Sequence, residues 1–93
     1  MSKKNPIVSD AVTISNELGL HARSAAKIAE LAQNAKSKVW IQKGDETVDA
    51  KSIIDILTLA CGKGATIRVV IEEDADVSIL NSIVTLAKNG FGE

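Results

Sequence analysis

The chain has 93 residues, of which 45% are hydrophobic and 25% charged, and its formal net charge is -1. These values are typical of one soluble globular domain and argue against intrinsic disorder. A single cysteine and a single histidine exclude an internal disulfide and any metal site built from several such side chains, so we expect no metal and no cofactor. No apolar run approaches the roughly 18 residues of a membrane span, so we expect no membrane insertion. The balanced charge and the 2% aromatic content disfavour nucleic-acid binding.

The first third of the chain predicts a strand followed by a helix. Residues 1–6 are polar and end in Pro6, which indicates a flexible leader without the apolar segment of a secretory signal, so we expect a cytoplasmic protein. Residues 7–14 are rich in Val, Ile and Thr and alternate in polarity, as a strand does. Residues 21–32 have apolar side chains at helical spacing, and a stripe of alanines would let this helix pack close to a sheet. That stripe consists of Ala22, Ala25, Ala26, Ala29 and Ala32.

The rest of the chain predicts a hairpin, a further strand and two more helices. Residues 38–43 and 47–49 flank a short polar turn, which is typical of a hairpin. Residues 53–60 predict a short helix, residues 65–71 a fourth strand, and residues 76–88 an amphipathic helix.

The predicted order is therefore β-α-β-β-α-β-α, in a single domain that spans residues 1–93. Helices that alternate with a small sheet containing a hairpin indicate an α+β fold. We expect an open-faced β-sandwich, in which three helices cover one face of a four-stranded antiparallel sheet. The Thr, Gln and Arg side chains in the strands indicate that the other face is mostly solvated.

The most informative residue is His21, the only histidine, which follows a glycine loop and immediately precedes a predicted helix. The start of a helix favours anions, and imidazole is nucleophilic and largely neutral near pH 7. Arg23 lies two residues further on and can neutralise phosphate oxygens. The pattern fits a histidine that accepts and releases a phosphoryl group. A helix cap or an ordinary surface histidine would produce the same short pattern.

The predicted helix over residues 53–60 is apolar on more than one side. Its inward positions could be Ile56, Leu59 and Ala60, which leaves further apolar side chains either deeply buried or exposed as a patch for a partner. Those side chains are Ile53, Ile54 and Leu57.

Ser52 precedes this helix, where it could serve as the N-cap or as a regulatory phosphorylation site. Cys61 follows an apolar run and is expected to be a small buried hydrophobe rather than a redox thiol.

Two segments together resemble a known family. Residues 19–23 (Gly-Leu-His-Ala-Arg) and residues 50–53 (Ala-Lys-Ser-Ile) are similar to the motifs of HPr, the histidine-containing phosphocarrier of the bacterial sugar phosphotransferase system. The resemblance extends over about residues 11–87. It implies a four-stranded antiparallel sheet with three helices on one side, which agrees with the expected fold.

The resemblance also implies a role for each candidate residue. His21 would accept a phosphoryl group on Nδ1 from phosphorylated enzyme I and pass it to a histidine of an enzyme IIA protein, with Arg23 supporting the phosphorylated state. Ser52 matches a serine that an ATP-dependent kinase modifies in some bacteria, and a phosphorylase could reverse that modification. Ile53, Ile54 and Leu57 match the partner-docking surface. We expect a stoichiometric carrier, not an enzyme, that acts as a monomer.

This sequence departs from the family pattern in two ways. Ser24 stands where the family usually has proline, and a first-turn position predicts that proline there would be neutral or stabilising. Acidic side chains, including Glu30 and Asp55, lie near the expected docking surface. Because of these acidic side chains, it stays open whether the protein serves sugar uptake or a regulatory branch of the phosphotransferase system. The alternative function is a regulatory HPr-like binding module controlled by phosphorylation of Ser52.

Overall fold

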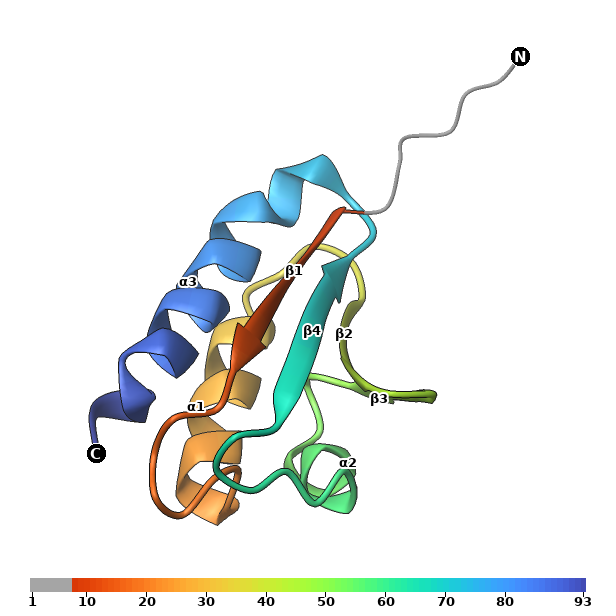
Figure 1. Cartoon of the computed structure of the whole chain (residues 1–93). Coiled ribbons are helices and arrows are strands. Elements are labelled where there is room, and N and C mark those ends of the chain that lie inside the picture. The colour runs from red at the N-terminus through yellow and green to blue at the C-terminus, as the bar shows by residue number, and fades with distance from the viewer. Residues whose placement is uncertain (1–7) are drawn as a thin grey trace.

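The computed structural model describes residues 8–93, so the leader predicted over residues 1–6 lies outside the described residues. The chain forms four strands and three α-helices in the predicted order (Figure 1). They are β1 (Val8–Thr13), α1 (Ala22–Ala32), β2 (Val39–Lys43), β3 (Glu46–Asp49), α2 (Ile53–Thr58), β4 (Thr66–Ile71) and α3 (Val77–Lys88). Short 3-10 turns at Asp74–Asp76 and Gly90–Gly92 precede and follow α3.

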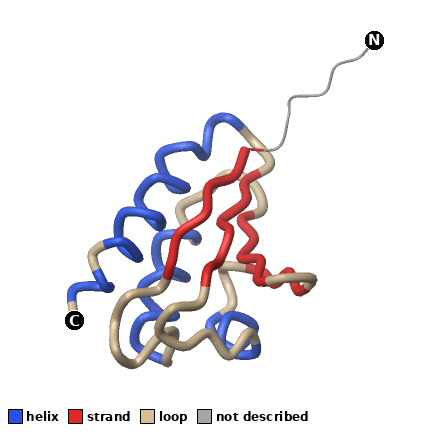
Figure 2. The backbone as a smooth tube through the Cα atoms, in the orientation of Figure 1, coloured by secondary structure: helices blue, strands red, loops and turns tan. Residues whose placement is uncertain are grey.

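The four strands form one antiparallel sheet in the order β1-β4-β2-β3. The strand β4, late in the sequence, therefore lies in the middle of the sheet between β1 and β2. Helices α1 and α3 pack beside each other on one side of the sheet, and α2 lies against α1 (Figure 2). The α+β prediction, with three helices on one face of a four-stranded antiparallel sheet, is confirmed.

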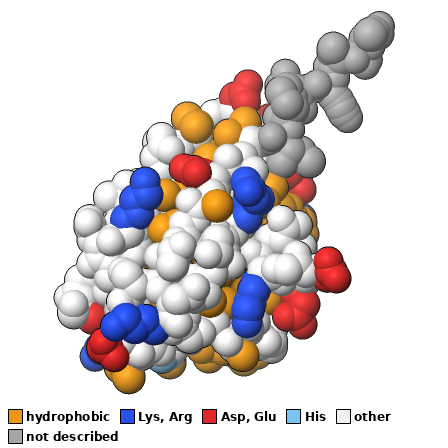
Figure 3. Space-filling model, in the orientation of Figure 1, with side chains coloured by type: hydrophobic (Ala, Val, Ile, Leu, Met, Phe, Trp, Pro, Cys, Tyr) orange, Lys and Arg blue, Asp and Glu red, His pale blue; other side chains and the backbone are white. Residues whose placement is uncertain are grey.

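The core lies between the helices and the sheet. Alternate strand residues such as Ile41, Ile67 and Val69 are fully buried or nearly so, and α1 and α3 cover them with small and branched side chains. On the other face Thr13 and Thr66 are exposed and share a hydrogen bond between their hydroxyl groups, at 3.2 Å. In Figure 3 charged side chains are scattered over a largely polar surface. The open face is thus mostly solvated, as the strand composition indicates.

A buried carboxylate joins two elements that the sequence leaves far apart. Asp76 is 1% exposed and accepts hydrogen bonds from the backbone N–H groups of Lys36 (2.8 Å) and Ser37 (3.0 Å). These contacts fasten the α1–β2 connection to the start of α3, which begins at Val77 and not at residue 76. The buried charge is tolerated because backbone donors satisfy it.

Two predicted core positions are wrong. Ala22 was expected on the buried stripe of α1, but it lies at the first helical position and is exposed. Ala60 was expected inside α2, but that helix ends at Thr58 and Ala60 is exposed with a φ of 52°. A residue with positive φ cannot continue a right-handed helix, so Ala60 ends the helix in the way a C-terminal glycine usually does.

Candidate functional site

His21 lies at the N-terminal boundary of α1. Its backbone is extended, with φ −115° and ψ −176°, and the helix begins at Ala22. Its carbonyl accepts a hydrogen bond from the Ala25 N–H at 2.8 Å, in the first turn of the helix. N–H groups at a helix start lack intrahelical acceptors and have partial positive charge. The imidazole, whose side chain is 25% exposed, is therefore open to solvent at a place that favours an anion.

The loop before His21 depends on a glycine. Gly19 has a φ of +66°, and a Cβ there would lie only 2.4 Å from the Cys61 carbonyl oxygen. The Leu20 N–H donates to the same oxygen at 2.8 Å, which holds the two loops together. Any side chain at Gly19 would push these loops apart and displace His21.

Cys61 itself is 3% exposed, and burial raises the pKa of its thiol, so it is the small buried hydrophobe expected.

Ser24 connects the first turn of α1 to the loop before it. Its side chain is fully buried, and its Oγ accepts the His21 N–H at 2.9 Å. The same hydroxyl lies 3.1 Å from the Gly19 carbonyl oxygen and 3.1 Å from the His21 carbonyl oxygen, either of which can accept its proton. The ring of His21 in turn faces the Ser24 N–H, as in a capping box. Proline could not reproduce these hydroxyl contacts.

Glu93 lies against the imidazole, although it is far from His21 in the sequence. Its Oε2 is 2.5 Å from His21 Nε2 and 3.4 Å from Arg23 Nε. Its Oε1 accepts a hydrogen bond from Asn16 Nδ2 at 2.9 Å. His21 and Arg23 are thereby brought together through one shared carboxylate.

The pKa of Glu93 is lowered, chiefly by the hydrogen bond from Asn16 and also by His21 and Arg23, while burial opposes the shift. The carboxylate is therefore ionised at neutral pH.

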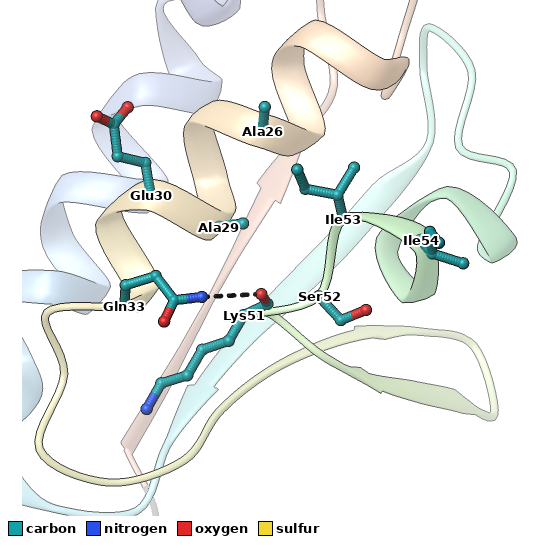
Figure 4. Close-up of a pocket in the computed structure, with 8 residues that line it drawn as sticks. All are labelled: Ala26, Ala29, Glu30, Gln33, Lys51, Ser52, Ile53 and Ile54. Atoms are coloured by element: carbon teal, nitrogen blue, oxygen red, sulfur yellow. Dashed lines mark hydrogen bonds between the residues drawn. The ribbon is translucent and has the colours of Figure 1, made fainter.

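Three residues of the second predicted group, Ser52, Ile53 and Ile54, line a groove between α1 and α2 (Figure 4), and Leu57 does not. Ser52 is the N-cap of α2, and its Oγ accepts the Asp55 N–H at 3.2 Å. Ile53 is 40% exposed and Ile54 is 74% exposed, whereas Leu57 is partly buried. Ile53 and Ile54 therefore form an exposed apolar patch, whereas Leu57 packs against the core.

The α1 side of this groove is built from small and polar side chains. Ala26 and Ala29 form its floor, with Glu30 and Gln33 beside them (Figure 4). Gln33 Nε2 donates to the Lys51 carbonyl oxygen at 3.0 Å, which fixes the spacing of the two walls.

Sequence reasoning missed Glu93, Asn16 and the hydroxyl contacts of Ser24. No local pattern marks Glu93, because its partners lie 70 or more residues away along the chain. The glycines of the Gly90–Gly92 turn were a weak signal that the chain reverses there, but not of what it approaches.

Two negative findings hold for residues 8–93. Within that range no three His, Cys, Asp or Glu side chains gather closely enough to bind a metal ion. None of the helices described there is both long enough and apolar enough to span a bilayer.

Comparison with known proteins identifies the family. Residues 8–89 match the family model described as the PTS HPr component phosphorylation site. This chain belongs to the HPr family. Among curated relatives, the phosphocarrier protein HPr of Cupriavidus necator is 40% identical over 81 residues, covering 87% of this chain and 91% of that protein. The phosphocarrier protein NPr of Klebsiella oxytoca is 38% identical over 87 residues, covering 92% of this chain and 97% of that protein.

Solved HPr structures have the same fold. HPr-C-His from Thermoanaerobacter tengcongensis superimposes with a TM-score of 0.86 at 32% identity, covering 92% of this chain and 97% of that one. The solution structure of Crh, the Bacillus subtilis catabolite repression HPr, agrees less closely. Its TM-score is 0.64 at 26% identity, with 87% and 96% of the two chains covered.

Proposed function

We propose that this HPr-family protein accepts a phosphoryl group on His21 Nδ1 from phosphorylated enzyme I and passes it to a histidine of an enzyme IIA protein. The observation that supports this most is the placement of His21. Its half-buried imidazole stands at the start of α1, beside Arg23, with Nε2 already occupied by Glu93. Family membership supports the coarser statement that the protein is a phosphocarrier.

The geometry fits a reversible phosphoryl relay. The Nδ1 lone pair attacks phosphorus, and the bond from phosphorus to the donor histidine breaks with its electron pair. The free N–H groups at the start of α1 and the Arg23 guanidinium can neutralise the phosphate oxygens without enclosing them. Arg23 has a side chain that is 63% exposed, so it can move between Glu93 and a phosphoryl group. An open site of this kind suits a carrier that must meet two partners in turn.

The exposed patch on α2 is the proposed docking surface. Ile53, Ile54 and Leu57 present apolar area next to the α1–α2 groove, close to the helix that positions His21. Apolar side chains at the centre of an interface supply most of its affinity. Enzyme I and the enzyme IIA acceptor would use this surface in succession, with the protein acting as a cytoplasmic monomer.

Ser52 is the proposed regulatory position. A serine kinase would place a phosphate beside the docking surface, and a phosphorylase would remove it. The alternative, a purely regulatory module in which His21 is idle, is not favoured. His21 and Arg23 are both present, and the more similar relatives are phosphocarriers.

The test is labelling by enzyme I and phosphoenolpyruvate. We expect the native chain to gain one acid-labile, alkali-stable phosphoryl group, and His21→Ala to gain none. Asp45→Ala, in the exposed turn between β2 and β3, is the matched control and should label like the native chain. Equal labelling of the native chain and His21→Ala would contradict the proposal.

A further inference from the structure

The contact between Glu93 and His21 is held by several independent anchors. Phe91 is fully buried although its φ is 59°, an unusual conformation for a residue other than glycine. Lys27 Nζ, from α1, donates to the Phe91 carbonyl oxygen at 2.5 Å. Asn16 Nδ2 then holds the second carboxylate oxygen of Glu93. These contacts fix the turn after α3 on both sides, and the Glu93 carboxylate therefore lies against the Nε2 edge of the His21 imidazole.

The chemistry of this contact determines where the imidazole proton lies. An ionised carboxylate can only accept hydrogen bonds, and the lowered pKa of Glu93 keeps it ionised at neutral pH. His21 Nε2, at 2.5 Å from Oε2, must therefore be the nitrogen that carries the proton. In the neutral ring this leaves the lone pair on Nδ1.

We infer that Glu93 is a positioning residue for His21. Its side-chain carboxylate holds the Nε2–H, shields Nε2 from phosphoryl donors and directs phosphorylation to Nδ1. This inference rests on the proposed function, in which His21 is the phosphoryl acceptor, and adds a residue outside both sequence motifs.

The carboxylate also has a role once the phosphoryl group is attached. When Nδ1 forms its bond to phosphorus, the electron pair of the broken bond leaves with the donor, and Nε2 keeps its proton. The ring then has a positive charge, which Glu93 faces directly. When the phosphoryl group is transferred to an acceptor, the Nδ1–P bond breaks and its electron pair stays on Nδ1. The ring is then neutral again, and the Nε2 proton has not moved. Glu93 therefore acts through His21 and does not itself touch the phosphoryl group.

The experiment uses a small chemical donor in place of enzyme I. Potassium phosphoramidate phosphorylates accessible histidines without a protein partner. The phosphoryl group moves to the ring nitrogen, and ammonia leaves. Imidazole ¹⁵N and ³¹P NMR then measure the ratio of Nδ1 to Nε2 phosphohistidine. The samples are the native chain, Glu93→Ala, Glu93→Gln and the control Asp45→Ala.

We expect phosphorylation at Nδ1 in the native chain and in Asp45→Ala. Glu93→Ala should raise the Nε2 share by about tenfold or more, the factor that corresponds to loss of one charge-assisted hydrogen bond. Glu93→Gln keeps an oxygen that can accept the Nε2–H but loses the negative charge, so its ratio should lie between those of the native chain and Glu93→Ala, which a merely structural defect would not produce. An unchanged ratio in Glu93→Ala, or absence of Nδ1 product in the native chain, would overturn the inference.

A parallel reaction separates this inference from the proposed function. The same native sample is offered to enzyme I charged with phosphoenolpyruvate. If enzyme I fails to label it while phosphoramidate gives the predicted ratios, the relay is wrong and the assignment of Glu93 stands. If enzyme I labels it but Glu93→Ala leaves the phosphoramidate ratio unchanged, the relay stands and the assignment of Glu93 falls.

Discussion

At the scale of single residues, Ser24 connects the first turn of α1 to the preceding loop through its side-chain hydroxyl. Its buried Oγ accepts the His21 N–H and lies within hydrogen-bond distance of the Gly19 carbonyl oxygen. These contacts tie His21 to the loop before it. Proline would instead restrict the backbone and leave the His21 N–H without this acceptor.

Ser24→Ala is therefore expected to lower the free energy of unfolding by about 1 kcal/mol, because a donor inside the first turn loses its partner. Chemical denaturation measures this change. Ser78→Ala, at an exposed position on α3, is the matched control and should change stability by less than about 0.5 kcal/mol. Indistinguishable midpoints for the two variants would show that the Ser24 hydroxyl adds nothing.

The same contacts revise the sequence-based expectation for Ser24→Pro. That expectation considered only the N–H of a first-turn residue, which proline can dispense with. Since the hydroxyl contacts are also lost, we now expect Ser24→Pro to be no more stable than the native chain. A melting temperature above that of the native chain would support the earlier expectation instead.

At the scale of elements, α2 is a short helix with a buried side and an exposed apolar side. Ile56 is fully buried and anchors the helix to the core, whereas Ile54 projects into solvent at 74% exposure. Burial alone thus separates the side chain that stabilises the fold from the side chain available to a partner. The sequence predicted Ile56 as an inward position but left open whether Ile54 is buried or exposed to a partner.

Ile54→Asp is expected to weaken enzyme I binding by about tenfold, because loss of one central apolar contact costs an interface more than 1 kcal/mol. Calorimetry or analytical ultracentrifugation measures the affinity. The melting temperature should hardly change, since Ile54 lies outside the core. Val77→Asp is the control, because Val77 is 43% exposed but lies at the start of α3. Equal loss of affinity in both variants would contradict a docking surface on α2.

Phosphorylation of Ser52 is expected to slow phosphoryl transfer to His21 while leaving α2 folded. The phosphate would add nearly two negative charges beside the α1–α2 groove, which Glu30 already lines, and next to the exposed Asp55 in the first turn of α2. The helix should persist because negative charge at its N-terminus faces the positive end of its dipole. Relay rates of the phosphoserine protein and the unmodified protein give the comparison, and equal rates would reject this regulation.

For the whole molecule, local patterns predicted the fold well because each element has its own periodicity. Alternation marked the strands, the apolar stripe marked α1, and Ser52 marked the start of α2. The same reasoning failed where a contact is set by the tertiary fold. The end of α2 near Ala60 depends on a left-handed residue, and the burial of Asp76 depends on backbone donors from another loop.

The candidate site likewise has one part that the sequence predicts and one part that only the tertiary fold reveals. His21 and Arg23 are close in sequence, so a short motif predicted them together. Their link through Glu93 exists only because α3 runs back along α1 and the turn after it reverses the chain (Figure 1). A pattern read from the sequence can indicate His21 as the proposed acceptor, but only the assembled fold brings the Glu93 carboxylate beside it.

The central claim is that the protein carries a phosphoryl group and gives it up intact. The most direct measurement is a single-turnover discharge. The chain is first phosphorylated with enzyme I and phosphoenolpyruvate, then purified and mixed with an enzyme IIA protein. We predict that the label leaves His21 and appears on the acceptor in equal amount, with the carrier recovered unmodified. Label that stays on His21, or that is released as inorganic phosphate without reaching the acceptor, would contradict a phosphocarrier role.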